Sequence, residues 1–78
     1  MTLSNPLDPE LPVWRDTDGE VLACIEKIRV LNENLQELRD LALAALEDGL
    51  LIGCDEEQLR NTMRAMIDAL HTDYQPRR

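Results

Sequence analysis

The residues of this chain that could carry chemistry are sixteen carboxylates, two cysteines and one histidine. Adjacent acids such as Glu47 and Asp48 could in principle serve as an acid and base pair or hold a cation. Asp68 stands three residues before His71, at the spacing where di-metal helical bundles carry a Glu-x-x-His motif. Because the Glu of that motif is missing, Asp68 and His71 are better interpreted as a pair on a helix surface.

The cysteines do not indicate a metal or redox site. Cys24 and Cys54 form no C-x-x-C pair, and His71 alone cannot complete a usual zinc set with them. Cys54 precedes three acids at 55–57, which oppose formation of a thiolate. The chain also lacks a glycine-rich phosphate loop and the G-x-S-x-G and H-E-x-x-H motifs. We therefore expect no enzymatic activity, no metal and no cofactor.

Length and composition predict one small helical domain. The chain has 78 residues, of which 44% are hydrophobic and 31% charged, and it has one Trp, one Tyr and no Phe. Its core must then be aliphatic, which favours helices. A chain of this size buries too little surface to be comfortably stable alone, so we expect it to share a core with a second copy or a partner.

Charge and the absence of targeting segments restrict the partners. The formal net charge of −8 argues against binding to nucleic acid or to an anionic membrane, because both need a basic face. The N-terminal residues show neither the basic region nor the apolar run of a signal peptide or membrane span. A cytoplasmic protein is expected.

An extended arm is predicted over residues 1–16. Three prolines, at positions 6, 9 and 12, block a helix there and favour extended backbone. The arm also carries apolar side chains, and those that could contact a partner are Leu7, Leu11, Val13 and Trp14. We favour a strap across the protein's own helices; a docking peptide for another protein and plain disorder are the alternatives.

The first helix of a helical hairpin domain over 17–78 is predicted at 17–48. Its N-terminus, Thr17-Asp18-Gly19-Glu20, has the form of a capping box. Gly49 is expected to follow the last helical residue and to open a connector over 49–54.

The second helix is predicted at 55–74. Asp55 can cap it, and Glu56 and Glu57 in its first turn suit the positive end of the helix dipole. It cannot extend far beyond that range because Pro76 follows. Spacing of four predicts surface ion pairs of Glu56 with Arg60 and of Arg64 with Asp68.

Apolar residues of the first helix recur in heptad order and predict a coiled-coil-like seam. The predicted dimer seam consists of Val21, Cys24, Ile25, Ile28, Leu31, Leu35, Leu38, Ala42, Ala45 and Leu46. The shorter second helix, folded back antiparallel, cannot reach 21–25. A homodimer that forms a four-helix bundle would cover this stretch.

The orientation of the two copies has two candidate solutions. An antiparallel dimer with its two-fold axis near Glu33 and Asn34 would lay 21–25 against the apolar stretch 41–46 of the other copy. β-branched residues at the first heptad position and Leu at the fourth suit a parallel pair instead. We prefer the antiparallel arrangement, and the parallel one stays open.

The expected function is that of a small non-enzymatic interaction module, an adaptor or an accessory or regulatory subunit, which acts as a homodimer and binds another protein. The long seam, the missing chemistry and the apolar arm support this hypothesis. As an alternative, the acidic surface could imitate nucleic acid and inhibit a DNA- or RNA-binding protein.

Overall fold

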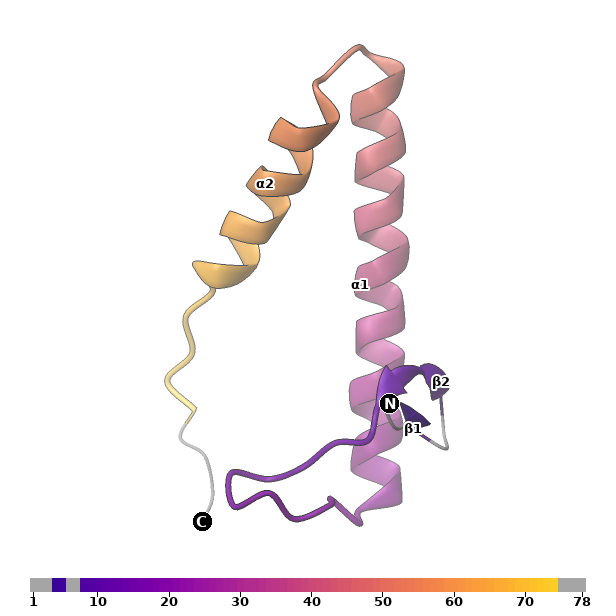
Figure 1. Cartoon of the computed structure of the whole chain (residues 1–78), viewed down its shortest axis with the longest axis vertical. Helices are drawn as coiled ribbons and strands as arrows, with labels where there is room; N and C mark the ends of the chain where they lie inside the picture. The colour runs from indigo at the N-terminus through magenta and orange to yellow at the C-terminus, as the bar shows by residue number, and fades with distance from the viewer. Residues whose placement is uncertain (1–3, 6–7, 75–78) are drawn as a thin grey trace. The chain divides into compact units, whose positions relative to one another are not determined.

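The computed structural model describes residues 4–5 and 8–74 (Figure 1). Its elements in chain order are β1 (Ser4–Asn5), β2 (Asp8–Pro12), α1 (Ile25–Leu51) and α2 (Glu56–Asp68). The chain consists of two compact units, the first extending to Glu37 and the second beginning at Leu38, with α1 continuous through the boundary. The predicted all-α class is confirmed in its main feature, since two helices of unequal length dominate the described residues.

The arm of the first unit is extended, as predicted, but it folds back on itself. β1 pairs with β2 in antiparallel fashion, with Ser4 opposite Pro12 and Asn5 opposite Asp8. The register is irregular between Ser4 and Asn5. A proline cannot donate to a ladder, so Pro9 and Pro12 are compatible with a short two-stranded ribbon.

A turn at residues 16–20 replaces the predicted start of the first helix. The Asp16 carboxylate accepts hydrogen bonds from the backbone N–H groups of Asp18 and Glu20, both at 2.9 Å. The Glu20 N–H is the group that Thr17 would have accepted in a capping box, and a carboxylate competes better than a hydroxyl. Gly19 completes the turn at φ +86°, in the left-handed region.

The prediction that the helix begins at Thr17 was therefore wrong by two turns. The turn brings Val21 opposite Arg15 in an isolated antiparallel bridge, and the Leu22 N–H donates to the Trp14 carbonyl at 3.0 Å. Helical bonding starts only where the Ile28 N–H donates to the Cys24 carbonyl at 3.0 Å. Competition between a local hairpin and a helix was decided here by the Asp16 side chain.

The best-buried side chains of the first unit are Ile28 and Asn32, 8% and 4% exposed, one turn apart on α1. The indole Nε1 of Trp14 donates to Asn32 Oδ1 at 2.8 Å. The arm is thus fastened to the first half of α1. This contact supports the strap that we preferred at the outset.

α1 ends at Leu51, later than predicted, because its capping glycine is Gly53 and not Gly49. Gly53 has φ +95°, its N–H donates to the Leu50 carbonyl, and the Cys54 N–H donates to the Gly49 carbonyl at 2.9 Å. This pair of bonds is a Schellman motif. The connector is correspondingly shorter than the predicted 49–54.

Gly49 lies inside α1 and is buried. A Cβ at this position would collide with Leu59 Cδ2. The glycine therefore permits a close approach of the two helices in the second unit. This contact makes the second unit the helical hairpin that the sequence predicts.

α2 begins as predicted and ends earlier. The Asp55 carboxylate accepts from the Gln58 N–H at 2.8 Å, and Arg60 pairs with Glu56 at 2.8 Å. Arg64 donates to Asn61 instead of pairing with Asp68.

The helix stops at Asp68 and not at residue 74. Beyond it, the Thr72 hydroxyl accepts the Tyr74 N–H and His71 contacts Asp73. Such local side-chain bonds compete with helical bonding.

Candidate interaction surface

The residues that could carry chemistry are dispersed in the structure. Cys24 and Cys54 are both free and exposed. His71 Nε2 lies 3.2 Å from Asp73 Oδ1, and both side chains are in solvent. Asp68 ends α2, so His71 is not on the same helix as the acid with which it was expected to pair. Among residues 4–5 and 8–74, no group of three or more His, Cys, Asp or Glu side chains could hold a metal ion.

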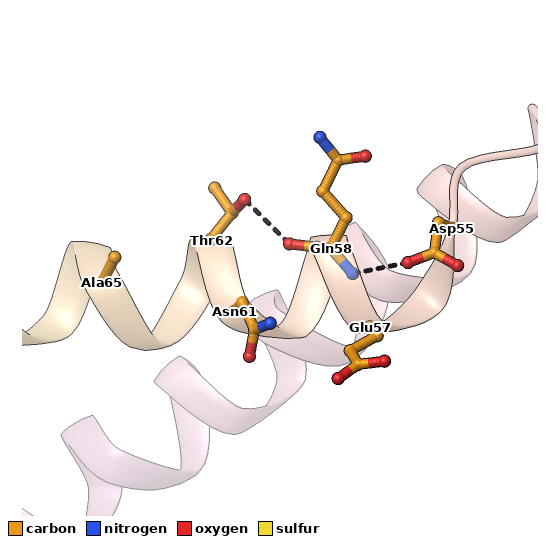
Figure 2. A pocket seen from close by; sticks show the side chains of 6 residues that line it. All are labelled: Asp55, Glu57, Gln58, Asn61, Thr62 and Ala65. Carbon is orange, nitrogen blue, oxygen red and sulfur yellow. Dashed lines mark hydrogen bonds between the residues drawn. The ribbon is translucent and has the colours of Figure 1, made fainter.

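The polar face of α2 carries a shallow hollow lined by Asp55, Glu57, Gln58, Asn61, Thr62 and Ala65 (Figure 2). Its hydrogen bonds serve the helix itself. Asp55 caps the Gln58 N–H, and the Thr62 hydroxyl donates to the Gln58 carbonyl at 2.9 Å. Its lining includes no histidine or cysteine and no cationic side chain that could activate the Thr62 hydroxyl, so we assign it no chemistry.

A smaller hollow of about 220 Å³ lies between the two helices of the second unit. Its apolar lining comes from Ala42, Met63 and Ile67, and its rim carries Arg60 and Arg64. Each arginine already has a partner on its own helix, in Glu56 and Asn61 respectively. The rim therefore stabilises α2 and offers no free pair of cations.

The predicted seam residues divide into three groups by environment. The first group lies outside the helix or at its edge: Val21 and Cys24 precede α1, and Ile25 is its first residue. In the second, Ile28 is buried and Leu35, Ala42 and Leu46 are half-buried by the chain itself. In the third, Leu31, Leu38 and Ala45 are exposed.

Exposed apolar side chains occur on both helices. On α1 they include Val30, Leu41, Leu43 and Leu51 in addition to the exposed seam residues, and on α2 they are Met66 and Ile67. Leu41 is 70% exposed. Groups of such residues on a small protein indicate an interaction surface.

The arm residues expected to contact a partner are placed as follows. Leu7 is outside the described residues. Leu11, Val13 and Trp14 are each half-buried, and Trp14 is hydrogen-bonded to Asn32. These side chains are thus partly committed to the chain's own first unit.

Sequence reasoning missed two features of this surface. Asn32 is buried beside Ile28, and nothing in its spacing marked it as the acceptor for an indole. Leu41 lay in the apolar stretch 41–46 but off the strict heptad seam. A search for a second heptad repeat, displaced around the same helix, could have found it.

No helix among the described residues is both long enough and apolar enough to cross a membrane. Comparisons with protein-family models, with curated proteins and with solved structures gave no match to this chain.

Proposed function

We propose that this chain is a small non-enzymatic interaction module that self-associates into a homodimer and serves another protein as an adaptor or as an accessory or regulatory subunit. The observation that carries the proposal is the apolar surface that the helices leave in solvent. Burial of such apolar surface against another polypeptide removes it from water and stabilises the folded chain.

The distribution of burial supports the same proposal. Ile28 is the one buried apolar side chain among those the structure describes, whereas Leu31, Leu38 and Leu41 on the same helix are exposed. Transfer of a leucine side chain from water into an interface contributes about 1.5–3 kcal/mol. A second chain would therefore supply stability that this one lacks.

Sedimentation equilibrium of the full chain tests self-association. We expect the mass of a dimer at micromolar concentration, with dissociation on dilution and a loss of helical circular dichroism as the dimer dissociates. A monomeric mass at the highest concentrations would overturn the proposed homodimer.

Recovery of a second protein tests the accessory role. The bait is the tagged full chain, and a matched bait carries Leu51→Glu and Met66→Glu, at two exposed apolar positions. We expect one protein in stoichiometric amount with the first bait and its depletion with the second. Equal recovery with both baits would show that these two side chains do not bind it.

Imitation of nucleic acid is the competing function, and salt dependence distinguishes it. The ion pairs Glu26–Arg29 and Glu56–Arg60 intersperse cations among the acids of both helices, which weakens a continuous acidic face. Apolar docking predicts partner binding that changes little between low and high salt. A steep loss of affinity with salt would favour the mimic.

A further inference from the structure

Seven exposed residues on α1 form a second heptad-like line, which we call the outer stripe. They alternate in steps of four and three and therefore share one face of the helix. The outer stripe consists of Lys27, Leu31, Asn34, Leu38, Leu41, Ala45 and Asp48, all exposed to solvent. Its middle is apolar and its two ends carry opposite charges.

The outer stripe is not the seam that the sequence first indicated. That seam included the first heptad positions, Ile28, Leu35 and Ala42, and the chain itself buries or half-buries all three. The fourth heptad positions, Leu31 and Leu38, remain exposed. The outer stripe is therefore displaced around the helix from the predicted seam.

We propose that the outer stripe is the seam of an antiparallel homodimer centred between Glu37 and Leu38, with Lys27 of each copy opposite Asp48 of the other. This inference rests on the self-association proposed above and adds the surface, the orientation and the register. The occupant of the stripe is a second copy of this chain.

The charges of Lys27 and Asp48, at the two ends of the stripe, favour a second copy of this chain as the occupant and an antiparallel orientation. The midpoint between Lys27 and Asp48 falls between Glu37 and Leu38. In an antiparallel pair, residues equally distant from the centre meet, so a cation faces an anion at both ends. A parallel pair would set Lys27 against Lys27 and Asp48 against Asp48, which is repulsive at both ends.

The structure also removes the reason for the earlier register about Glu33 and Asn34. That register served to cover a helical stretch 21–25, but residues 21–24 precede α1. The β-branched Ile28, a cue for a parallel pair, is buried by the chain itself and is not in the outer stripe. Asn34 is in the stripe and would favour a parallel pair, since a polar residue in a seam can specify register by meeting its own copy. Two like-charged contacts oppose that cue.

Two glutamate substitutions on α1 test the surface. Leu38 and Leu43 are 45% and 51% exposed, and Leu43 lies about 140° around the helix from Leu38. Leu38→Glu places two carboxylates at the centre of the seam, and we expect it to raise the dimer dissociation constant at least about 100-fold. The matched control Leu43→Glu should change it less than about twofold. Circular dichroism at high protein concentration monitors folding of both variants.

Charge exchange tests the orientation. Lys27→Glu alone and Asp48→Lys alone each make both ends of an antiparallel seam repulsive, and each should weaken the dimer by about tenfold at low salt. The double exchange restores opposite charges and should recover most of the affinity. In a parallel dimer neither single exchange relieves or adds a like-charged contact, so all three variants would match the parent.

A cross-link adds a readout that does not depend on affinity. With Cys24→Ser and Cys54→Ser as background, a chain carrying Lys27→Cys is mixed with one carrying Asp48→Cys. Oxidation should give the mixed disulfide dimer in excess over both like pairs.

The outcomes separate this inference from the broader proposal. A monomeric parent chain overturns both. A dimer that survives Leu38→Glu and is broken by Leu43→Glu refutes the outer stripe and leaves self-association standing. A dimer that Leu38→Glu breaks, but that cross-links 27 to 27, refutes the antiparallel orientation.

Discussion

The indole Nε1 of Trp14 donates to the side-chain carbonyl of Asn32 at 2.8 Å, eighteen residues along the chain. The same amide of Asn32 has a buried nitrogen, Nδ2, with no hydrogen-bond partner. One half of the side chain thus fastens the arm to α1 and the other half costs free energy. An unsatisfied buried donor costs about 1–3 kcal/mol.

Trp14→Phe should lower the free energy of unfolding by about 1 kcal/mol, because it removes the donor to Asn32 and leaves the whole amide unpaired. Urea unfolding followed by circular dichroism measures the change. Unchanged stability would mean that the hydrogen bond contributes nothing in solution.

Asn32→Leu should change the free energy of unfolding by different amounts in the Trp14→Phe protein and in the parent. In the Trp14→Phe protein it removes a buried amide without a partner and should raise stability by about 1–3 kcal/mol. In the parent protein it also leaves the indole N–H unpaired, so the gain should largely vanish. Additive effects across this double-mutant cycle would contradict coupling of Trp14 and Asn32.

Gly53→Ala should destabilise the chain by about 1–2 kcal/mol through its backbone alone, because φ is +95° and a Cβ there has nothing within 4 Å. The control is Gly53→Asn, since asparagine tolerates the left-handed region better. Thermal unfolding should rank Gly above Asn above Ala. Equal melting temperatures for all three would show that the Schellman turn does not persist in solution.

Gly49→Ala tests the contact between α1 and α2. Alanine has the higher helix propensity, by about 1 kcal/mol, but its Cβ would meet the end of the flexible Leu59 side chain, which must move aside. The gain in stability should therefore fall short of about 1 kcal/mol in the parent and reach that size when Leu59→Ala removes the obstacle. Equal gains in the two backgrounds would show that Leu59 does not oppose a side chain at this position.

Asp55→Ala should cost about 0.5–2 kcal/mol by removing the acceptor for the Gln58 N–H. Asp55→Asn keeps an oxygen at the same place and should cost much less. Amide hydrogen exchange in the first turn of α2 provides the local readout. Protection that is unaltered in Asp55→Ala would contradict capping by this side chain.

The sequence was most informative where one local signal had no competitor. Asp55 caps α2 as expected, its carboxylate accepting from the Gln58 N–H, and the prolines keep helix out of the arm. At Thr17 the capping signal competed with Asp16 and Gly19, whose turn takes the same N–H group. Propensity alone could not rank a hydroxyl against a carboxylate one residue away.

The part of the site that could not be predicted depends on contacts between distant segments. Heptad order placed Ile28 and Leu38 in one seam, whereas the fold buries Ile28 and leaves Leu38 exposed. Which line of a helix its own chain covers depends on how the arm returns through Trp14. The outer stripe therefore emerges only after the intrachain contacts are known.

Among the described residues, Ile28 is the one buried apolar side chain. So small a core affects how long the chain survives in the presence of proteases. Helices held by so few buried contacts open locally at little free-energy cost, and proteases cleave the open form. Helices whose apolar surface is covered by a second chain open less often than helices exposed to solvent. On the association proposed above, copies that no second chain covers would be cleaved first.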